Sequence, residues 1–172
     1  MNIVDCVQST QKLQGALIEC GVYEGGTAYL IQQHNLQNKP FYLVDSFEGL
    51  PAPTIDDGDQ PLPLKQGDYK GNIEKAIEKL PYENITIIKG TIPNAFKAIQ
   101  NAEFCFAHLD LDFHDATLES IKFIEPHLVK DGIILIHDAH LYGIKRAIST
   151  YFNIKLTDIE PLPDNYWMWQ KP

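Results

Sequence analysis

The sequence has little of what marks nucleic-acid-binding, secreted or membrane-spanning proteins. Its 172 residues contain 14 Lys and Arg against 23 Asp and Glu, a net charge of −9, so a surface that neutralises many phosphates is not expected. No apolar run approaches the length of a membrane span, and the first residues lack the basic start and apolar stretch of a signal peptide. Three cysteines without Cys-x-x-Cys spacing predict buried free thiols: Cys6, Cys20 and Cys105. We therefore expect a cytoplasmic protein that binds neither nucleic acid nor membranes.

The order of apolar patterns predicts a single α/β domain over residues 1–172. Short apolar runs, typical of strands covered on both faces, alternate with segments whose apolar residues recur at helical spacing. The predicted strands are residues 16–20, 41–45, 84–89, 103–110 and 132–138, followed by an antiparallel hairpin of 154–160 and 166–170. The predicted helices are residues 3–13, 26–37, 72–80, 93–100, 115–128 and 142–152. We therefore expect a mostly parallel, seven-stranded sheet with helices on both faces.

The stretch from Ala16 to Ile31 predicts a strand, a tight turn and a helix. Gly21, Gly25 and Gly26 would let the backbone turn sharply and let a ligand approach the main chain. The spacing differs from the Gly-x-Gly-x-x-Gly of dinucleotide-binding folds, and Glu19 before the first glycine favours a ligand with positive charge. S-adenosylmethionine, which carries an ammonium group and a sulfonium, meets that requirement. A strand-to-helix turn whose glycines serve only packing is the alternative.

The connection over residues 46–71 is long for a compact domain, and such length is typical of a binding loop. A solvated surface excursion is the alternative. The connection contains four prolines and an acidic cluster, namely Pro51, Pro53, Pro61, Pro63 and Asp56-Asp57-Gly58-Asp59.

Polar side chains follow the predicted strands. The carboxyl ends of parallel strands share one edge, where open α/β sheets bind ligands, so we expect these residues to gather there. They are Glu19, Asp45, Ser46, Thr91, Asp110, Asp112, His114, His137, Asp138 and His140, together with Gly90 in the turn before Thr91. An acid at the end of the second strand can accept hydrogen bonds from both ribose hydroxyls, so Asp45 predicts a nucleoside ligand, with a turn-capping aspartate as the alternative.

Five motifs resemble those of the class I S-adenosylmethionine-dependent methyltransferases and, within them, the macrocin O-methyltransferase (TylF/MycF-like) family. They are Ile18-Glu-Cys-Gly-Val-Tyr-Glu-Gly-Gly-Thr27, Val44-Asp-Ser-Phe-Glu-Gly-Leu-Pro51, Ile88-Lys-Gly-Thr91, Leu109-Asp-Leu-Asp-Phe-His-Asp-Ala-Thr117 and Ile136-His-Asp138. The resemblance implies a Rossmann-like class I methyltransferase fold and S-adenosylmethionine as the cofactor. It implies that Glu19, Gly21 and Tyr23 line the methionine end of the cofactor. Asp45 would hold the ribose, Ser46, Gly90 and Thr91 would border the adenine, and Gly25 and Asp110 would complete the cofactor site.

The resemblance also implies a divalent metal held by an aspartate after the fourth strand and an acidic pair after the fifth. These positions are Asp110 and the pair His137-Asp138, in which histidine replaces the first aspartate of the family. Magnesium is the expected metal, and manganese is the alternative because an imidazole ligand favours transition metals over magnesium. Either His137 does not bind the metal directly or the metal differs.

The implied activity is methyl transfer from S-adenosylmethionine to a hydroxyl of a small polar acceptor such as a sugar. Asp110, Asp112 and His114 are the candidate catalytic residues, with His140 as a further candidate proton acceptor. Family members fold an N-terminal helical segment over the substrate that is longer than the one expected here. One alternative is therefore a non-catalytic nucleoside-binding module without an acceptor pocket. A nicotinamide-dependent oxidoreductase is a weaker alternative. The aromatic segment 166–169 fits either a core strand or a homo-oligomer interface.

Overall fold

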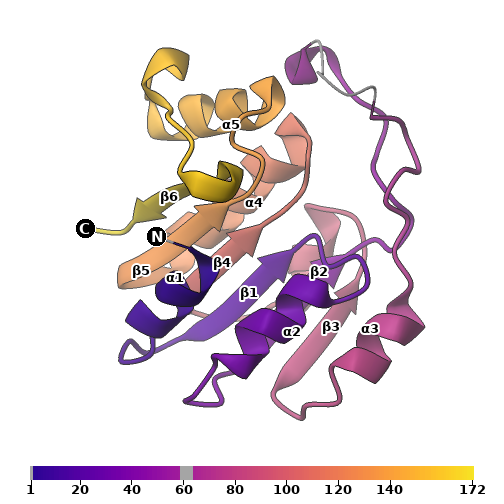
Figure 1. Ribbon diagram of the computed structural model, residues 1–172, viewed down its shortest axis with the longest axis vertical. Helices are drawn as coiled ribbons and strands as arrows, with labels where there is room; N and C mark the ends of the chain where they lie inside the picture. Colours follow the sequence, from indigo (N-terminus) through magenta and orange to yellow (C-terminus); the bar gives the residue numbers. More distant parts are fainter. Residues whose placement is uncertain (1, 59–63) are drawn as a thin grey trace.

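A single twisted sheet forms the centre of the computed structural model, which describes residues 2–58 and 64–172. Its six strands run in the order β3-β2-β1-β4-β5-β6 (Figure 1). They are β1 (Ala16–Cys20), β2 (Phe41–Asp45), β3 (Ile85–Lys89), β4 (Phe104–Leu109), β5 (Leu128–Ile136) and β6 (Trp167–Gln170). All neighbouring pairs are parallel except β5 and β6, which are antiparallel. The predicted α/β class and mostly parallel sheet are confirmed.

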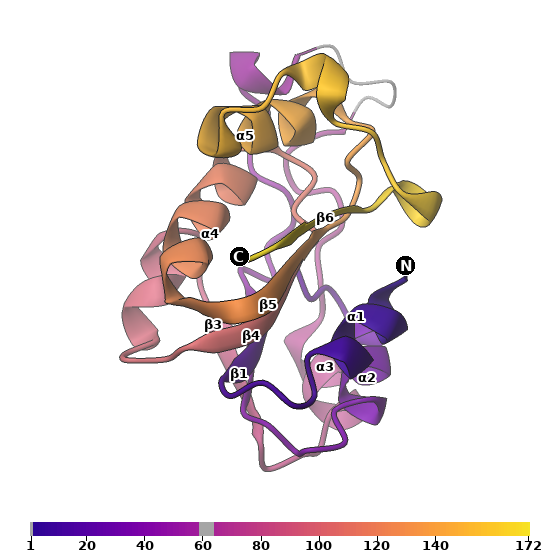
Figure 2. The ribbon, with the colours of Figure 1, turned by 90° about the vertical axis from the view of Figure 1, so that its left-hand side faces the viewer.

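Helices cover both faces of the sheet (Figures 1 and 2). One face carries α1 (Ile3–Ser9), α2 (Gly26–Gln33) and α3 (Ile73–Lys79), and the other carries α4 (His114–His127) and α5 (Tyr142–Phe152). Alternate strand residues contribute to two separate cores, because successive side chains of a strand point to opposite faces. Leu17 therefore packs in the core under α2, whereas Ile18 packs in the core under α4.

The closing hairpin is not formed among the described residues, and the sheet has six strands rather than the predicted seven. Residues 154–160 contain a 3-10 helix, Leu156–Asp158, closed by a hydrogen bond from the Asp158 amide to the Lys155 carbonyl. The apolar side chains Ile154 and Ile159 pack into the core on the α5 side of the sheet instead of forming a strand face. The aromatic tail is strand β6, which pairs directly with β5.

The three cysteines are buried and free, as expected. Burial raises the pKa of the Cys6 thiol to about 11, and it also raises the pKa values of Cys20 and Cys105. These thiols therefore stay protonated and unreactive at neutral pH. Within residues 2–58 and 64–172, no helix combines the length and apolar character needed to cross a bilayer.

Candidate active site

A cavity of about 780 Å³ opens at the carboxyl edge of the sheet. It is lined by strand ends and by the connection between β2 and α3, which supports the binding-loop interpretation over a solvated excursion. The predicted site residues in its wall are Gly21, Tyr23, Asp45, Ser46, Gly90, Thr91, Asp110, Asp112, His137 and Asp138. The connection adds Glu48, Gly49, Leu50, Pro51, Gln66, Gly67 and Tyr69, while Asp59, Pro61 and Pro63 lie outside the described residues.

The turn after β1 brings the ends of β1 and β4 into contact. Gly21 has a φ of +88°, and a Cβ added there would lie 1.8 Å from the carbonyl oxygen of Asp110. Only glycine fits this position, because both the backbone conformation and the close approach exclude a side chain. Gly25, with a φ of +76°, precedes α2 and packs near Leu80, outside the cavity wall.

Asp45 connects the end of β2 to the turn after β1. Its Oδ2 accepts hydrogen bonds from the amides of Val22 (2.7 Å) and Tyr23 (2.8 Å), and its Oδ1 accepts one from the amide of Phe47 (2.6 Å). The turn-capping role that the sequence left open is therefore present. A carboxylate offers about four lone-pair sites, so these three donors hold the group in place and leave capacity for a ligand hydroxyl at the cavity wall.

Glu19 lies inside the protein and is not part of the cavity wall. Its side chain is 0% exposed, and its Oε1 accepts a hydrogen bond from Nδ1 of His108, which is equally buried on β4 (2.9 Å). Burial raises the pKa of Glu19 against the opposing effect of the His108 hydrogen bond. In the described part of the chain, Glu19 Oε2 and His108 Nε2 have no hydrogen-bond partner. His108 was not anticipated, although it is the one polar residue in the run Phe104–Leu109.

The predicted metal ligands meet at the cavity wall. His137 Nδ1 lies 3.0 Å from Asp110 Oδ1 and 3.2 Å from Asp138 Oδ2, and the three ligand atoms all lie within 4.8 Å of one another. Hydrogen bonds to the two carboxylates raise the pKa of His137 to about 10, and the same histidine lowers the pKa of Asp138. These oxygen and nitrogen donors are chemically suited to a divalent cation.

Asp112 adds a third carboxyl group to this cluster. Burial, the charges of Asp110 and Asp138 and a hydrogen bond with Asp138 raise the pKa of Asp112 to about 7. A carboxyl group with a pKa near neutrality is suited to accept a proton during a reaction. Its backbone φ of 60° lies in the left-handed region, which carries strain for a residue other than glycine.

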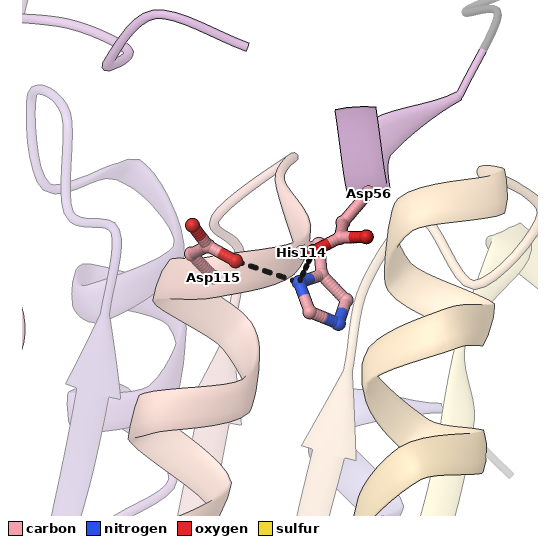
Figure 3. A group of neighbouring side chains, drawn as sticks. All are labelled: Asp56, His114 and Asp115. Carbon is pink, nitrogen blue, oxygen red and sulfur yellow. Dashed lines mark hydrogen bonds and ion pairs between the residues drawn. The ribbon is translucent and has the colours of Figure 1, made fainter. Parts of the chain in front are cut away.

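His114, the remaining predicted catalytic residue, lies at the start of α4 outside the cavity wall. Its side chain is almost fully buried, and its Nδ1 lies 2.7 Å from Asp115 Oδ1 and 3.9 Å from Asp56 Oδ2 (Figure 3). Asp56 belongs to a short 3-10 helix, η1 (Ile55–Asp57), and also pairs with Arg146 of α5 at 2.8 Å. Arg146 thus already neutralises charge in the group formed by Asp56, His114 and Asp115. Through these ion pairs, η1 attaches the connection between β2 and α3 to α4 and α5.

Asp57 is the most buried residue of η1. This residue is 1% exposed, and its Oδ1 accepts the amide hydrogen of His114 (2.7 Å). Its Oδ2 accepts hydrogen bonds from the amide (2.6 Å) and hydroxyl (3.2 Å) of Thr54. Asp57 therefore anchors the cavity-lining connection to the start of α4. The sequence showed an acidic cluster in this segment, but it did not show that the side chain of Asp57 is buried.

We expect Asp57→Ala to lower the free energy of unfolding by about 2–4 kcal/mol, because it leaves buried donors unpaired. Urea unfolding followed by circular dichroism measures this change. The neighbouring Asp56→Asn is the control, since its partly exposed ion pair with Arg146 should contribute no more than about 1 kcal/mol. Equal destabilisation by the two substitutions would contradict the anchoring role of Asp57.

The fold and the strand-end cavity define an α/β protein of the class I methyltransferase type. Calicheamicin methyltransferase CalS11 has a similar structure, with a TM-score of 0.74 and 18% sequence identity over 97% of this chain and 76% of that protein. An O-methyltransferase from Bacillus cereus, determined in complex with S-adenosylhomocysteine (SAH), has a TM-score of 0.59 and 10% identity over 88% of this chain and 66% of that one.

A model of the Macrocin-O-methyltransferase (TylF) family matches residues 1–164, so the chain belongs to this family. Mycinamicin III 3''-O-methyltransferase of Micromonospora griseorubida is 23% identical in an alignment of 172 positions that covers 87% of this chain. The match spans 66% of that relative, just under two thirds of its length.

Proposed function

We propose that the protein transfers a methyl group from S-adenosylmethionine to a hydroxyl of a small polar acceptor, in particular a sugar. The observation that carries this proposal is the cavity itself, in which the Gly21 turn and Asp45 lie in one wall with the acidic cluster of Asp110, Asp112 and Asp138. The family, the related mycinamicin III 3''-O-methyltransferase and the structural similarity to CalS11, a TDP-rhamnose 3'-O-methyltransferase, support it. The same cluster argues against a non-catalytic module, because cofactor binding alone has no need of three carboxyl groups.

The cofactor would bind against the part of the cavity wall that is formed by the ends of β1, β2 and β3. The Gly21 turn would leave the backbone accessible to the methionine end, and Asp45, which three amides hold in place, would accept a hydrogen bond from a ribose hydroxyl. Gly90 and Thr91 would border the adenine. Apolar groups from Leu50, Pro51, Ile92 and Leu111 complete the wall and would exclude water during transfer.

A divalent cation would be held by Asp110, His137 and Asp138, whose ligand atoms converge without rearrangement of the backbone. When bound, such a cation polarises an acceptor hydroxyl and lowers its pKa. Asp112 would accept the hydroxyl proton, because its carboxyl group lies in the same wall as Asp110 and Asp138. The sulfonium is a strong leaving group, so the remaining task of the protein is to align the acceptor oxygen with the methyl carbon.

Calorimetric titration with SAH and an assay of methyl transfer to nucleotide sugars and glycosides test this proposal together. Asp45→Ala should weaken SAH binding by about 10–100-fold, the value of a charged hydrogen bond to a hydroxyl. Asp138→Ala should leave SAH affinity within about twofold and abolish transfer, because its carboxylate serves the acceptor side.

Asp45→Asn is the matched variant for the structural role of Asp45, since it keeps an acceptor oxygen for the amides of Val22 and Tyr23. Unchanged SAH affinity in Asp45→Ala would contradict the ribose assignment. Absence of SAH binding by the unmodified protein would overturn the proposed function, and SAH binding without transfer to any acceptor would favour the non-catalytic module.

A further inference from the structure

We propose that His137 binds the metal directly through Nδ1, and that this nitrogen makes the site select manganese and other first-row transition metals over magnesium. The inference rests on the proposed function, since it concerns the metal of the same site. It also decides between the two alternatives that the sequence left open for His137.

The imidazole of His137 lies beside both carboxylates of the site. The side chain of His137 is 30% exposed, and the nitrogen that faces the two carboxylates is Nδ1. Metal–ligand bonds of about 2.0–2.2 Å place neighbouring ligand atoms about 3 Å apart. The separations of 3.0 Å to Asp110 Oδ1 and 3.2 Å to Asp138 Oδ2 agree with that spacing. His137 therefore already stands where a third ligand belongs, rather than behind one of the carboxylates.

The ring is also held in this orientation. Its centroid lies 4.9 Å from that of the Tyr166 ring, which precedes β6. The His137 amide donates a hydrogen bond to the Leu109 carbonyl (2.8 Å), which fixes the backbone of the residue to the end of β4. Because the backbone is anchored, Nδ1 can turn away from Asp110 and Asp138 only by rotation of the side chain, and this rotation is opposed by the packing of the ring against Tyr166.

The chemical nature of the three ligand atoms determines which metal the site prefers. Magnesium requires oxygen ligands in a nearly ideal octahedron and retains its waters, whereas manganese, iron, cobalt and zinc accept an imidazole nitrogen readily. An aspartate at position 137 would supply a third oxygen and suit magnesium. The nitrogen of His137 shifts the preference to transition metals, and the carboxylates of Asp110 and Asp138 remain compatible with manganese.

The test compares manganese and magnesium binding to the unmodified protein and to His137→Asp by calorimetry, without acceptor present. We expect the unmodified protein to bind manganese at least about tenfold more tightly than magnesium, and His137→Asp to reduce that ratio severalfold. Pulsed electron paramagnetic resonance of the bound manganese gives a second, direct measurement. The unmodified protein should show coupling to a ligand nitrogen, and His137→Asp and His137→Gln should lose it.

His127→Gln is the control, because it removes an exposed imidazole at the end of α4, remote from the cavity. It should preserve both the metal preference and the nitrogen coupling. SAH titration in the presence of a chelator verifies that each variant is folded and tests the proposed function separately from the metal. Equal affinity for the two metals, failure of both metals to bind, or nitrogen coupling that persists in His137→Gln would overturn the assignment while SAH binding stands.

Discussion

Replacing Asp112 with asparagine should lower the rate of methyl transfer by about 10²–10⁴-fold, the usual contribution of a positioned proton acceptor. Asparagine keeps the size and hydrogen-bonding capacity of the side chain but cannot take up the acceptor proton. The affinity for SAH should change by less than about threefold, because no charged contact to the cofactor is removed. Single-turnover transfer assays and SAH calorimetry measure the two quantities.

The stability of the same variant distinguishes a catalytic role from a structural one. A carboxyl group whose pKa rises to about 7 on folding stabilises the protein below its unfolded pKa, and that stability is lost as the pH rises through 7. In metal-free buffer, Asp112→Asn should therefore be more stable than the unmodified protein at pH 8 by about 1 kcal/mol or more. Loss of transfer together with a gain in stability would identify the proton acceptor.

Asp115→Asn is the matched control, because Asp115 follows Asp112 closely in the chain but is exposed and lies outside the cavity wall. It should retain transfer activity. If Asp112→Asn transferred methyl groups at the unmodified rate, or if it lost SAH binding and stability together, Asp112 would not be the proton acceptor.

The second large effect is expected at Gly21. Gly21→Ala should lower the free energy of unfolding by about 3 kcal/mol or more, because a side chain is strained at this φ and its Cβ would overlap the backbone of Asp110, directly after β4. Relief of the overlap separates the turn from Asp110, so SAH affinity should fall by at least about tenfold in the protein that still folds. Thermal unfolding and SAH calorimetry measure these changes.

Gly26→Ala provides the control five positions along the same motif. No heavy atom lies within 4 Å of a Cβ added at Gly26, which is the first residue of α2. Alanine there should leave stability unchanged or raise it by about 0.4–1 kcal/mol. If the two alanine substitutions had equal effects, the close contact between the turn and β4 would not be required for the site.

The pattern of apolar and polar residues is enough to predict the α/β class, the strands β1 to β5 and the convergence of polar residues at one edge. Apolar runs specify strands covered on both faces, and parallel strands place their carboxyl ends together, so Asp110, His137 and Asp138 were predictable neighbours. Gly21 was predictable as a turn position, because glycine is the residue that a sharp turn with a close approach requires.

The partners of the individual polar side chains, in contrast, become visible only in the folded protein. Glu19 points into the interior and pairs with His108, His114 holds the connection at η1, and residues 154–160 pack against the α5 side of the core instead of forming a strand. Periodicity reports which positions of an element are buried, but not which partner a buried polar group finds, because that partner comes from another element distant in the sequence. For the same reason the resemblance to the family implied a metal site at Asp110, His137 and Asp138, whereas the proposal of a nitrogen ligand depends on the placement of Nδ1 beside both carboxylates.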